Sequence, residues 1–176
     1  MGGLAPEPFL AGLDDRLPRS GRALDVAGGD GRNGVWLAGR GLDVTLGDIS
    51  AEALRLAEAN AGSSQVSITT LAVDFDSDPF PPGPWDLIVC IRYLHRPLFR
   101  QFADQLRPEG LLVVVHPTIR NLERFERPGA HHLLGDGEIL ELLDGWTILR
   151  YQEGWRAGAS GRHEARCLAG KSATIH

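Results

Sequence analysis

The stretch Leu24–Ala38, LDVAGGDGRNGVWLA, contains the pattern that decides the fold. A short apolar run leads into three glycines, Gly29, Gly31 and Gly34, spaced as G-x-G-x-x-G, and apolar residues at helical spacing follow. Glycine is needed where φ is positive or where a side chain would collide with a bound ligand. A strand, a glycine-rich turn and a helix N-terminus together form a site that a cofactor can approach closely. The spacing alone is weak evidence, because a strand-to-helix turn without a ligand produces it too.

Outward from this stretch, short apolar runs alternate with helical stretches, which is typical of an α/β fold with a parallel sheet. The patterns predict strands at 22–26, 42–46, 66–73, 85–91 and 111–115, and helices at 8–17, 33–40, 51–61 and 97–106. After residue 115 they predict an irregular segment at 119–134, a helix at 138–143, and strands at 146–153 and 162–169 around a glycine-rich hairpin at 154–161. We therefore expect two closing strands, antiparallel, at one edge of a five-stranded parallel sheet.

Length and composition limit the classes of function. The 176 residues are enough for one domain, 1–176, which we divide into an N-terminal helix or lid (1–21), a cofactor-binding core (22–115) and a substrate-side segment with the closing strands (116–176). The net charge is −5 and no basic run is present, which argues against a nucleic-acid partner. The longest apolar run, 111–115, is too short to cross a membrane. No signal peptide is visible, so we expect a cytoplasmic protein.

The two cysteines, Cys90 and Cys167, lie in apolar strand-like runs and have no metal-ligand spacing. The pair His131-His132 and His163 also lack a cysteine or acid at ligand spacing. We therefore expect buried free thiols and no metal site.

Three acids near the ends of successive predicted strands indicate which cofactor the glycine loop serves. Asp25 lies two residues before the loop, where a carboxylate would repel a pyrophosphate but suits a cationic ligand, or else only binds loop amides. Asp48 follows the second strand, where it can accept both ribose hydroxyls or cap the helix beside Ser50. Asp74-Phe75 follows the third strand and suits an adenine amino group and ring, although acidic loops are often only solvated. About 60 residues remain after the fifth strand, too few for the second half of a nicotinamide enzyme.

Four segments carry a family resemblance: LDVAGGDGRNGVWLA, the acid in VTLGDIS, the VDF after the third strand, and WDLIVCIRYLHR. Together they resemble the class I S-adenosylmethionine-dependent methyltransferases, and the glycine stretch is most similar to the small bacterial tellurite-resistance group. The resemblance implies an α/β, Rossmann-like three-layer sandwich with a mostly parallel seven-stranded sheet, order 3-2-1-4-5-7-6, strand 7 antiparallel. It also implies S-adenosylmethionine as the cofactor and S-adenosylhomocysteine as its product.

Carried over residue by residue, the resemblance places the cofactor-binding site in and after the first four strands. One position departs from the family: its first loop glycine is Ala27 here, which fits if the φ angle stays negative. The expected cofactor-binding residues are Asp25, Ala27, Gly28, Gly29, Gly31, Asn33, Asp48, Ile49, Asp74, Phe75 and Ile91.

The segment after the fourth strand should face the transferred methyl group. Tyr93 is expected to orient the nucleophile and His95 to act as its base, although a histidine here is also often structural. Substrate contacts are expected from Arg92 and Arg96, which suit an anion, and from His116 at the end of the fifth strand, a second candidate base. We expect residues 118–134 to form a lid over the site, with a solvated connecting loop as the alternative.

The chain lacks an Asn/Asp-Pro-Pro-aromatic motif after the fourth strand and has no nucleic-acid-binding appendage. We therefore expect a small-molecule methyl acceptor, no nucleic-acid or membrane partner, and a homodimer as one possible assembly. Two alternatives stay open at this point: a non-catalytic module that only binds the nucleotide, and an NAD-dependent oxidoreductase.

Overall fold

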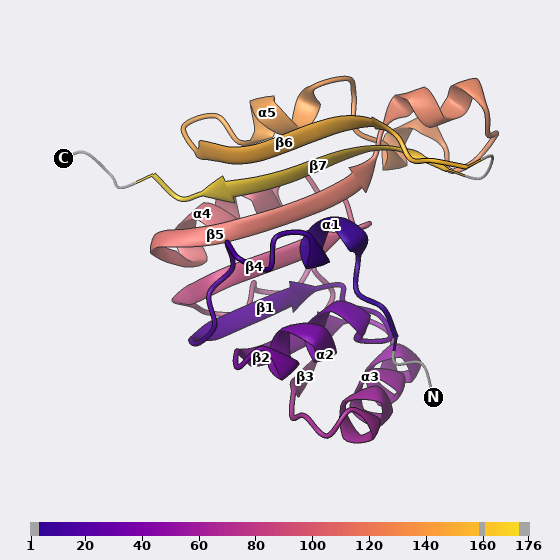
Figure 1. Cartoon of the computed structure of the whole chain (residues 1–176). Coiled ribbons are helices and arrows are strands. Elements are labelled where there is room, and N and C mark those ends of the chain that lie inside the picture. The colour runs from indigo at the N-terminus through magenta and orange to yellow at the C-terminus, as the bar shows by residue number, and fades with distance from the viewer. Residues whose placement is uncertain (1–3, 159–160, 173–176) are drawn as a thin grey trace.

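The computed structural model describes residues 4–158 and 161–172, and its centre is a seven-stranded sheet (Figure 1). The strand order is β3-β2-β1-β4-β5-β7-β6, with every neighbouring pair parallel except β5–β7 and β6–β7. The expected order and class are therefore confirmed. The strands are β1 (Arg22–Val26), β2 (Asp43–Asp48), β3 (Thr69–Ala72), β4 (Trp85–Ile91), β5 (Leu106–Pro117), β6 (Thr147–Trp155) and β7 (His163–Gly170).

Helices cover both faces of the sheet because alternate strand residues point to opposite faces. The helices are α1 (Pro8–Ala11), α2 (Arg32–Gly39), α3 (Ala51–Ser63), α4 (Leu98–Gln105) and α5 (Glu138–Leu142), with short 3-10 turns η1 (Ile119–Glu123) and η2 (Ala130–His132). One core layer joins α1 and α2 to residues such as Val113 and Val115, and the other joins α4 and α5 to Val114. The three-layer arrangement is therefore present.

Several predicted boundaries were wrong. The helix expected at 8–17 ends at Ala11, where Gly12 forms its C-cap and irregular turns follow. β3 begins at Thr69 rather than residue 66, because only Thr69–Ala72 pairs with β2. β5 begins at Leu106, so the residues expected to form a turn belong to this strand. A shift in its pairing register with β4 accommodates them. The closing strands are antiparallel as expected: β7 pairs antiparallel with both β5 and β6.

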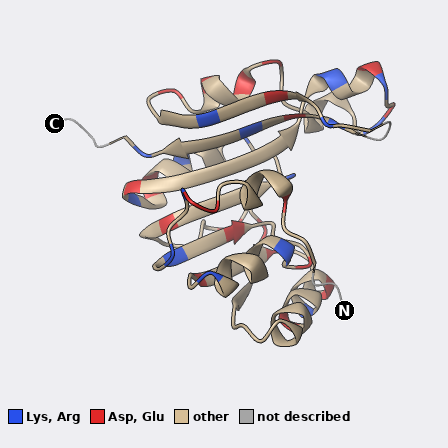
Figure 2. Ribbon diagram, viewed as in Figure 1, with Lys and Arg blue, Asp and Glu red and all other residues tan. Residues whose placement is uncertain are grey.

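Part of the expected organisation lies outside the described residues. This concerns residues 1–3 of the N-terminal segment, 159–160 of the hairpin and 173–176 of the closing segment. In the described part of the chain, no helix combines the length and apolar character that crossing a membrane requires. Figure 2 shows basic and acidic residues interspersed over the ribbon rather than gathered into a basic stripe.

The glycine loop between β1 and α2 turns through three residues with a left-handed φ, Ala27, Gly29 and Gly31. Gly31 has a φ of 83°, and a Cβ there would lie 2.8 Å from the Cβ of Ala57 on α3. Ala27 has a φ of 51°, so the negative angle expected for this alanine was wrong. The alanine therefore occupies a left-handed conformation that favours glycine, at a conformational cost of roughly 1–2 kcal/mol.

Replacing this alanine should show that cost. Ala27→Gly relieves the left-handed alanine but adds roughly 0.5–1 kcal/mol of unfolded-state entropy, so we expect a net gain of about 0.5 kcal/mol in the free energy of unfolding. Ala59→Gly, at an exposed position inside α3, should instead lose about 1 kcal/mol. Urea unfolding of both variants measures the contrast, and equal losses would show that Ala27 carries no strain.

Candidate functional site

A cavity of about 380 Å³ lies at the carboxyl ends of β1, β2 and β3, where ligands bind in open parallel sheets. We call it the β1–β3 cavity. Four of the expected cofactor residues line it beside Ala27, and the side chain of Ile49 is 69 % exposed at its rim. Its lining residues are Ala27, Asp48, Ile49, Val73, Asp74, Phe75, Asp76 and Tyr93.

Asp48 holds the glycine loop and lines the cavity at the same time. Its Oδ2 accepts the amide of Gly29 at 2.9 Å, and its Oδ1 accepts the amide of Ser50 at 2.9 Å. Ser50 in turn caps α3. The two roles considered for Asp48 are therefore compatible: each oxygen binds one amide and has lone pairs left for a ligand hydroxyl.

Asp74 shapes the loop after β3. Its Oδ1 accepts the amide of Asp76 at 2.9 Å, and its Oδ2 accepts the hydroxyl of Ser77 at 3.0 Å. Phe75 is 5 % exposed and packs near the ring of Tyr93, with 6.1 Å between ring centroids. The loop therefore joins the cavity wall to the core.

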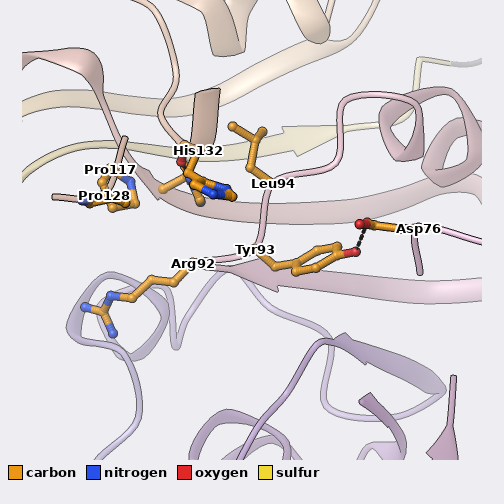
Figure 3. Close-up of a pocket in the computed structure, with 8 residues that line it drawn as sticks. Asp76, Arg92, Tyr93, Leu94, Pro117, Pro128 and His132 are labelled. Carbon is orange, nitrogen blue, oxygen red and sulfur yellow. Dashed lines mark hydrogen bonds between the residues drawn. The ribbon is translucent and has the colours of Figure 1, made fainter. Parts of the chain in front are cut away.

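A second cavity, of about 370 Å³, lies at the carboxyl ends of β4 and β5, and we call it the β4–β5 cavity (Figure 3). Arg92 begins its wall with a φ of 60°, and the Arg92 amide donates to the carbonyl of Val115 at 2.7 Å. This left-handed residue turns the chain sharply after β4, so that Tyr93 follows. The lining residues are Asp76, Arg92, Tyr93, Leu94, His116, Pro117, Pro128 and His132.

The two candidate catalytic residues meet on one carboxylate, that of Asp76, to which the sequence patterns assigned no role. The Tyr93 hydroxyl donates to Oδ1 of Asp76, and Nδ1 of His95 lies 3.2 Å from the same oxygen. Burial, and then the hydrogen bond to Asp76, raise the pKa of Tyr93 well above its usual value, so the phenol stays protonated. Asp76 and Tyr93 line both cavities and therefore lie where the two cavities meet. Figure 3 shows the hydrogen bond between the two side chains. The sequence signal was a second acid, two residues after Asp74.

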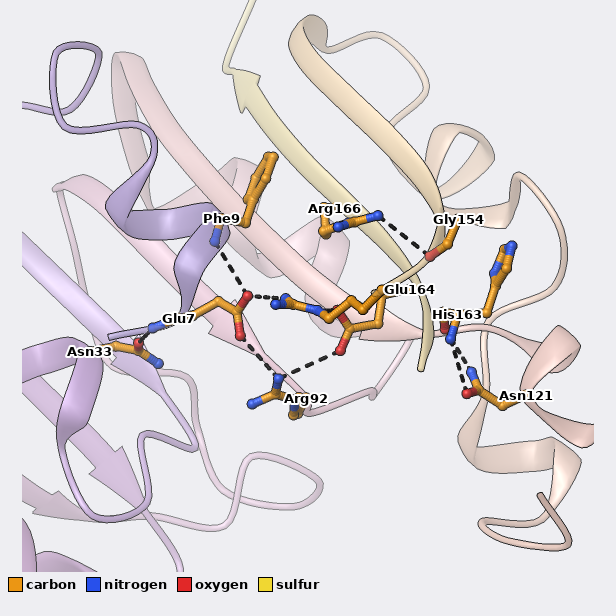
Figure 4. Close-up of polar contacts among 10 residues, drawn as sticks. Glu7, Phe9, Asn33, Arg92, Asn121, Gly154, His163, Glu164 and Arg166 are labelled. Carbon is orange, nitrogen blue, oxygen red and sulfur yellow. Dashed lines mark hydrogen bonds and ion pairs between the residues drawn. The ribbon is translucent and has the colours of Figure 1, made fainter. Parts of the chain in front are cut away.

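Arg92 was expected to bind an anionic substrate, but its guanidinium belongs to a group of four charged side chains that we call the ion quartet (Figure 4). Its Nη2 lies 3.0 Å from Oε2 of Glu7 and 3.5 Å from Oε1 of Glu164. Arg156 forms ion pairs with the same two carboxylates. Both glutamates are 1 % exposed, so the two arginines compensate two buried negative charges.

The quartet joins parts of the chain that are distant in sequence. Glu7 precedes α1, Arg92 follows β4, and Arg156 and Glu164 belong to the closing hairpin. The amide of Glu7 also donates to Oδ1 of Asn33 on α2 at 2.8 Å. Sequence patterns gave no signal for these pairs, because no local spacing connects residues 149 positions apart.

Eight of the expected site residues line neither cavity. Asn33 is engaged with Glu7, and Gly28 packs against Leu46 beneath the loop. Arg96 is paired with Glu138 and donates to the carbonyl of Leu133 at 3.1 Å. It borders a separate groove between α4 and α5. The eight residues are Asp25, Gly28, Gly29, Gly31, Asn33, Ile91, His95 and Arg96.

Asp25 is buried under the glycine loop rather than exposed to a ligand. It is 1 % exposed, and its Oδ2 has no hydrogen-bond partner among the described residues. Burial raises its pKa from 3.8 to about 7; the Gly34 amide lowers it in part, and the negative charges of Asp48 and Asp30 raise it further. The carboxyl is therefore largely protonated in the folded protein below neutral pH.

This raised pKa predicts a pH dependence of stability. Between 3.8 and about 7 the folded protein binds a proton that the unfolded chain has lost, so this group's contribution falls as pH rises and levels off above 7. Asp25→Asn removes the titration. We expect the free energy of unfolding to fall about 2 kcal/mol less between pH 5 and 7.5 in this variant than in the wild type. Denaturant titrations at both pH values measure this difference, and parallel curves would contradict it.

Removing one carboxylate of the ion quartet should be costly. Glu7→Gln leaves two arginines facing one buried carboxylate, so we expect a loss of about 3 kcal/mol in the free energy of unfolding. Glu52→Gln breaks the exposed pair with Arg55 and should change stability little. Chemical denaturation compares the two variants. Similar small losses in the free energy of unfolding would show that the ion quartet does not stabilise the fold.

Comparisons with known proteins place this site in a family. A family model described as "Methyltransferase domain" matches residues 23–110, which contain β1 to β4 and the glycine loop. The protein YqeM of Bacillus subtilis is 32 % identical over 123 residues, which are 64 % of this chain and 49 % of that protein. The chain thus spans about half the length of this curated relative.

Solved structures show the same fold. TehB from Haemophilus influenzae superposes with a TM-score of 0.79 at 18 % identity, covering 93 % of this chain and 61 % of that one. A SAM-dependent methyltransferase from Methanosarcina mazei gives a TM-score of 0.76 at 19 % identity, covering 96 % and 99 %. The matched family domain contains the β1–β3 cavity, and the TehB-like architecture agrees with the resemblance of the glycine stretch. The chain therefore belongs to the S-adenosylmethionine-dependent methyltransferases of class I, with their Rossmann-like fold.

Proposed function

We propose that this methyltransferase binds S-adenosylmethionine in the β1–β3 cavity and transfers its methyl group, by in-line displacement, to a small molecule in the β4–β5 cavity. The observation that carries the proposal is the shared wall. Two cavities of about 380 and 370 Å³ lie on either side of the Tyr93–Asp76 pair. In-line transfer requires donor and acceptor to approach across a short gap from which water is excluded.

The residues of the β1–β3 cavity fit an adenosine. Asp48 retains acceptor capacity for ribose hydroxyls after binding its two amides. Val73, Phe75 and the exposed Ile49 offer apolar surface for an adenine ring, and Asp74 offers a carboxylate for its amino group. Asp25, Gly28, Gly31 and Asn33 act from beneath or beside the loop and set its shape, while Ile91 brings the chain to the carboxyl edge.

S-adenosylmethionine supplies an activated methyl group with a thioether as its leaving group, so the protein mainly has to orient and desolvate. Tyr93 donates to Asp76 and presents its ring at the boundary of both cavities. His95 lines neither cavity, so we assign it a positioning role through Asp76 in place of a base. Arg92 shapes the wall, because its charge is already paired in the ion quartet.

Residues 118–134 form the outer wall of the β4–β5 cavity. The segment begins and ends at an isolated bridge between Thr118 and Leu134, and it contributes Pro128 and His132 to the lining. This placement favours the lid interpretation over that of a solvated connection. A cavity of this volume enclosed by a short loop suits a small molecule better than a polymer.

Calorimetric titration with S-adenosylmethionine, S-adenosylhomocysteine and NAD tests the proposed cofactor site. Asp48→Ala removes a charged acceptor of ribose hydroxyl groups, so we expect S-adenosylhomocysteine to bind at least tenfold more weakly. Asp43→Ala, at the opposite end of β2, is the matched control and should leave the affinity within about twofold. An unchanged affinity of Asp48→Ala, or binding of NAD alone, would show that the cofactor site is misplaced.

A further inference from the structure

His116 is the buried histidine of the β4–β5 cavity, and one of its ring nitrogens has no partner in the part of the chain that the structure describes. It lies near the end of β5 and is 5 % exposed. Val114, two residues before His116 on β5, packs in the core on the face covered by α4 and α5. Because alternate strand residues share a face, the side chain of His116 points to the same face. Its side chain is among those that line the cavity beside Leu94 and Pro117.

The hydrogen bonding of His116 determines which nitrogen carries the proton. Nε2 lies 2.8 Å from the backbone carbonyl of His132, and a carbonyl oxygen only accepts. Nε2 therefore bears the hydrogen, and Nδ1 has a free lone pair. Nδ1 is buried and has no hydrogen-bond partner among the described residues, and a buried acceptor without a partner is unfavourable. A donor that enters the cavity would satisfy it.

The imidazole is kept neutral. Burial lowers the pKa of His116, the contact with His132 raises it, and the positive charge of Arg96 lowers it further. Glu164 is the negative group that acts in the opposite direction, and the nearby His132 ring lowers the pKa slightly. The cavity therefore holds a neutral base at neutral pH.

We propose that His116 is the proton acceptor for methyl transfer and that the acceptor molecule is a phenol or enol with an apolar body. This assignment rests on the function proposed above and adds a substrate class to it. Leu94, Pro117 and Pro128 provide the apolar walls, and Nδ1 provides a buried neutral acceptor that has no partner among the described residues. The hydroxyl oxygen forms the new bond to the methyl carbon, and the breaking carbon–sulfur bond leaves its electron pair on sulfur.

In this step the hydroxyl proton moves to Nδ1, which gives an imidazolium that returns the proton to solvent after product release. Acidity selects the class of hydroxyl. A phenol ionises near pH 10, within reach of an imidazole, whereas an ordinary aliphatic alcohol is too weak an acid for this base. A thiol that is already ionised would not need His116 at all.

The proposal can be tested without knowing the natural acceptor. The probe is 4-nitrophenol, whose absorbance distinguishes phenol from phenolate, added to protein saturated with S-adenosylhomocysteine. We expect the apparent pKa of the bound probe to rise by about one unit relative to the free probe, because the neutral Nδ1 accepts a hydrogen bond from the phenol and offers no donor to the phenolate. His116→Asn and His116→Gln should abolish this shift. His131→Ala, at the exposed neighbour of His132, is the matched control and should retain it.

Nitrogen-15 NMR of histidine-labelled wild-type protein provides a readout that requires no substitution. We expect the Nε2–H form for His116 in the free protein and a change at Nδ1 when 4-nitrophenol is added. An Nδ1–H form, a probe that does not bind, or an equal probe pKa in the wild type and both His116 variants would each overturn the assignment.

Affinity for S-adenosylhomocysteine separates this failure from failure of the proposed function. If the cofactor product binds the wild type normally while the probe is unaffected, only the role of His116 is lost. If the cofactor product does not bind, the cofactor site itself is wrong. Thermal unfolding of each variant shows whether a lost shift reflects a lost fold.

Discussion

The reversal of strand order between β1 and β4 is the constraint on which the site depends. From β1 the chain adds β2 and β3 in one direction, and it then returns to place β4 and β5 on the other side. Right-handed crossovers of parallel strands put the connecting helices of the two halves on opposite faces. The loops at the carboxyl ends therefore diverge and leave a crevice there. The β1–β3 and β4–β5 cavities occupy the two sides of that crevice.

The ion quartet complements this arrangement from the other end of the chain. The sheet alone does not determine where the residues before α1 lie, and the 3-10 segments after β5 depend on the closing hairpin. Two buried glutamates, each shared by two arginines, connect the start of α1, the end of β4 and the hairpin around β7. Such a group is stable only when it is complete, because a missing partner leaves a buried charge uncompensated.

The sequence predicted what local spacing controls. The glycine loop, the alternation of strands and helices, and the acids Asp48 and Asp74 follow from patterns within a few residues, and the structure places both acids at one cavity. The family resemblance contributed the strand order, which no local pattern determines. The left-handed angle of Ala27 was not predictable from residue type, because alanine normally avoids it.

The sequence could not predict which charges find each other. Arg92 and Arg96 are close in sequence and were expected to share a ligand, yet one binds Glu7 and Glu164 and the other binds Glu138. Asp76 was missed because its local sequence resembles an ordinary acidic loop. Its neighbours are acidic, and nothing local indicated that a tyrosine and a histidine from the next strand would converge on it.

The wall shared by the two cavities has a thermodynamic consequence. Tyr93 and Asp76 face both sides, so a ligand that fixes their arrangement from one cavity changes the free energy of binding in the other. Linkage requires the effect to be reciprocal: whatever factor the bound cofactor applies to acceptor affinity, the acceptor applies to cofactor affinity. The Tyr93–Asp76 pair thus makes the binding of the methyl donor and the methyl acceptor either cooperative or competitive. The sign of this coupling free energy determines the order in which the two molecules enter and leave.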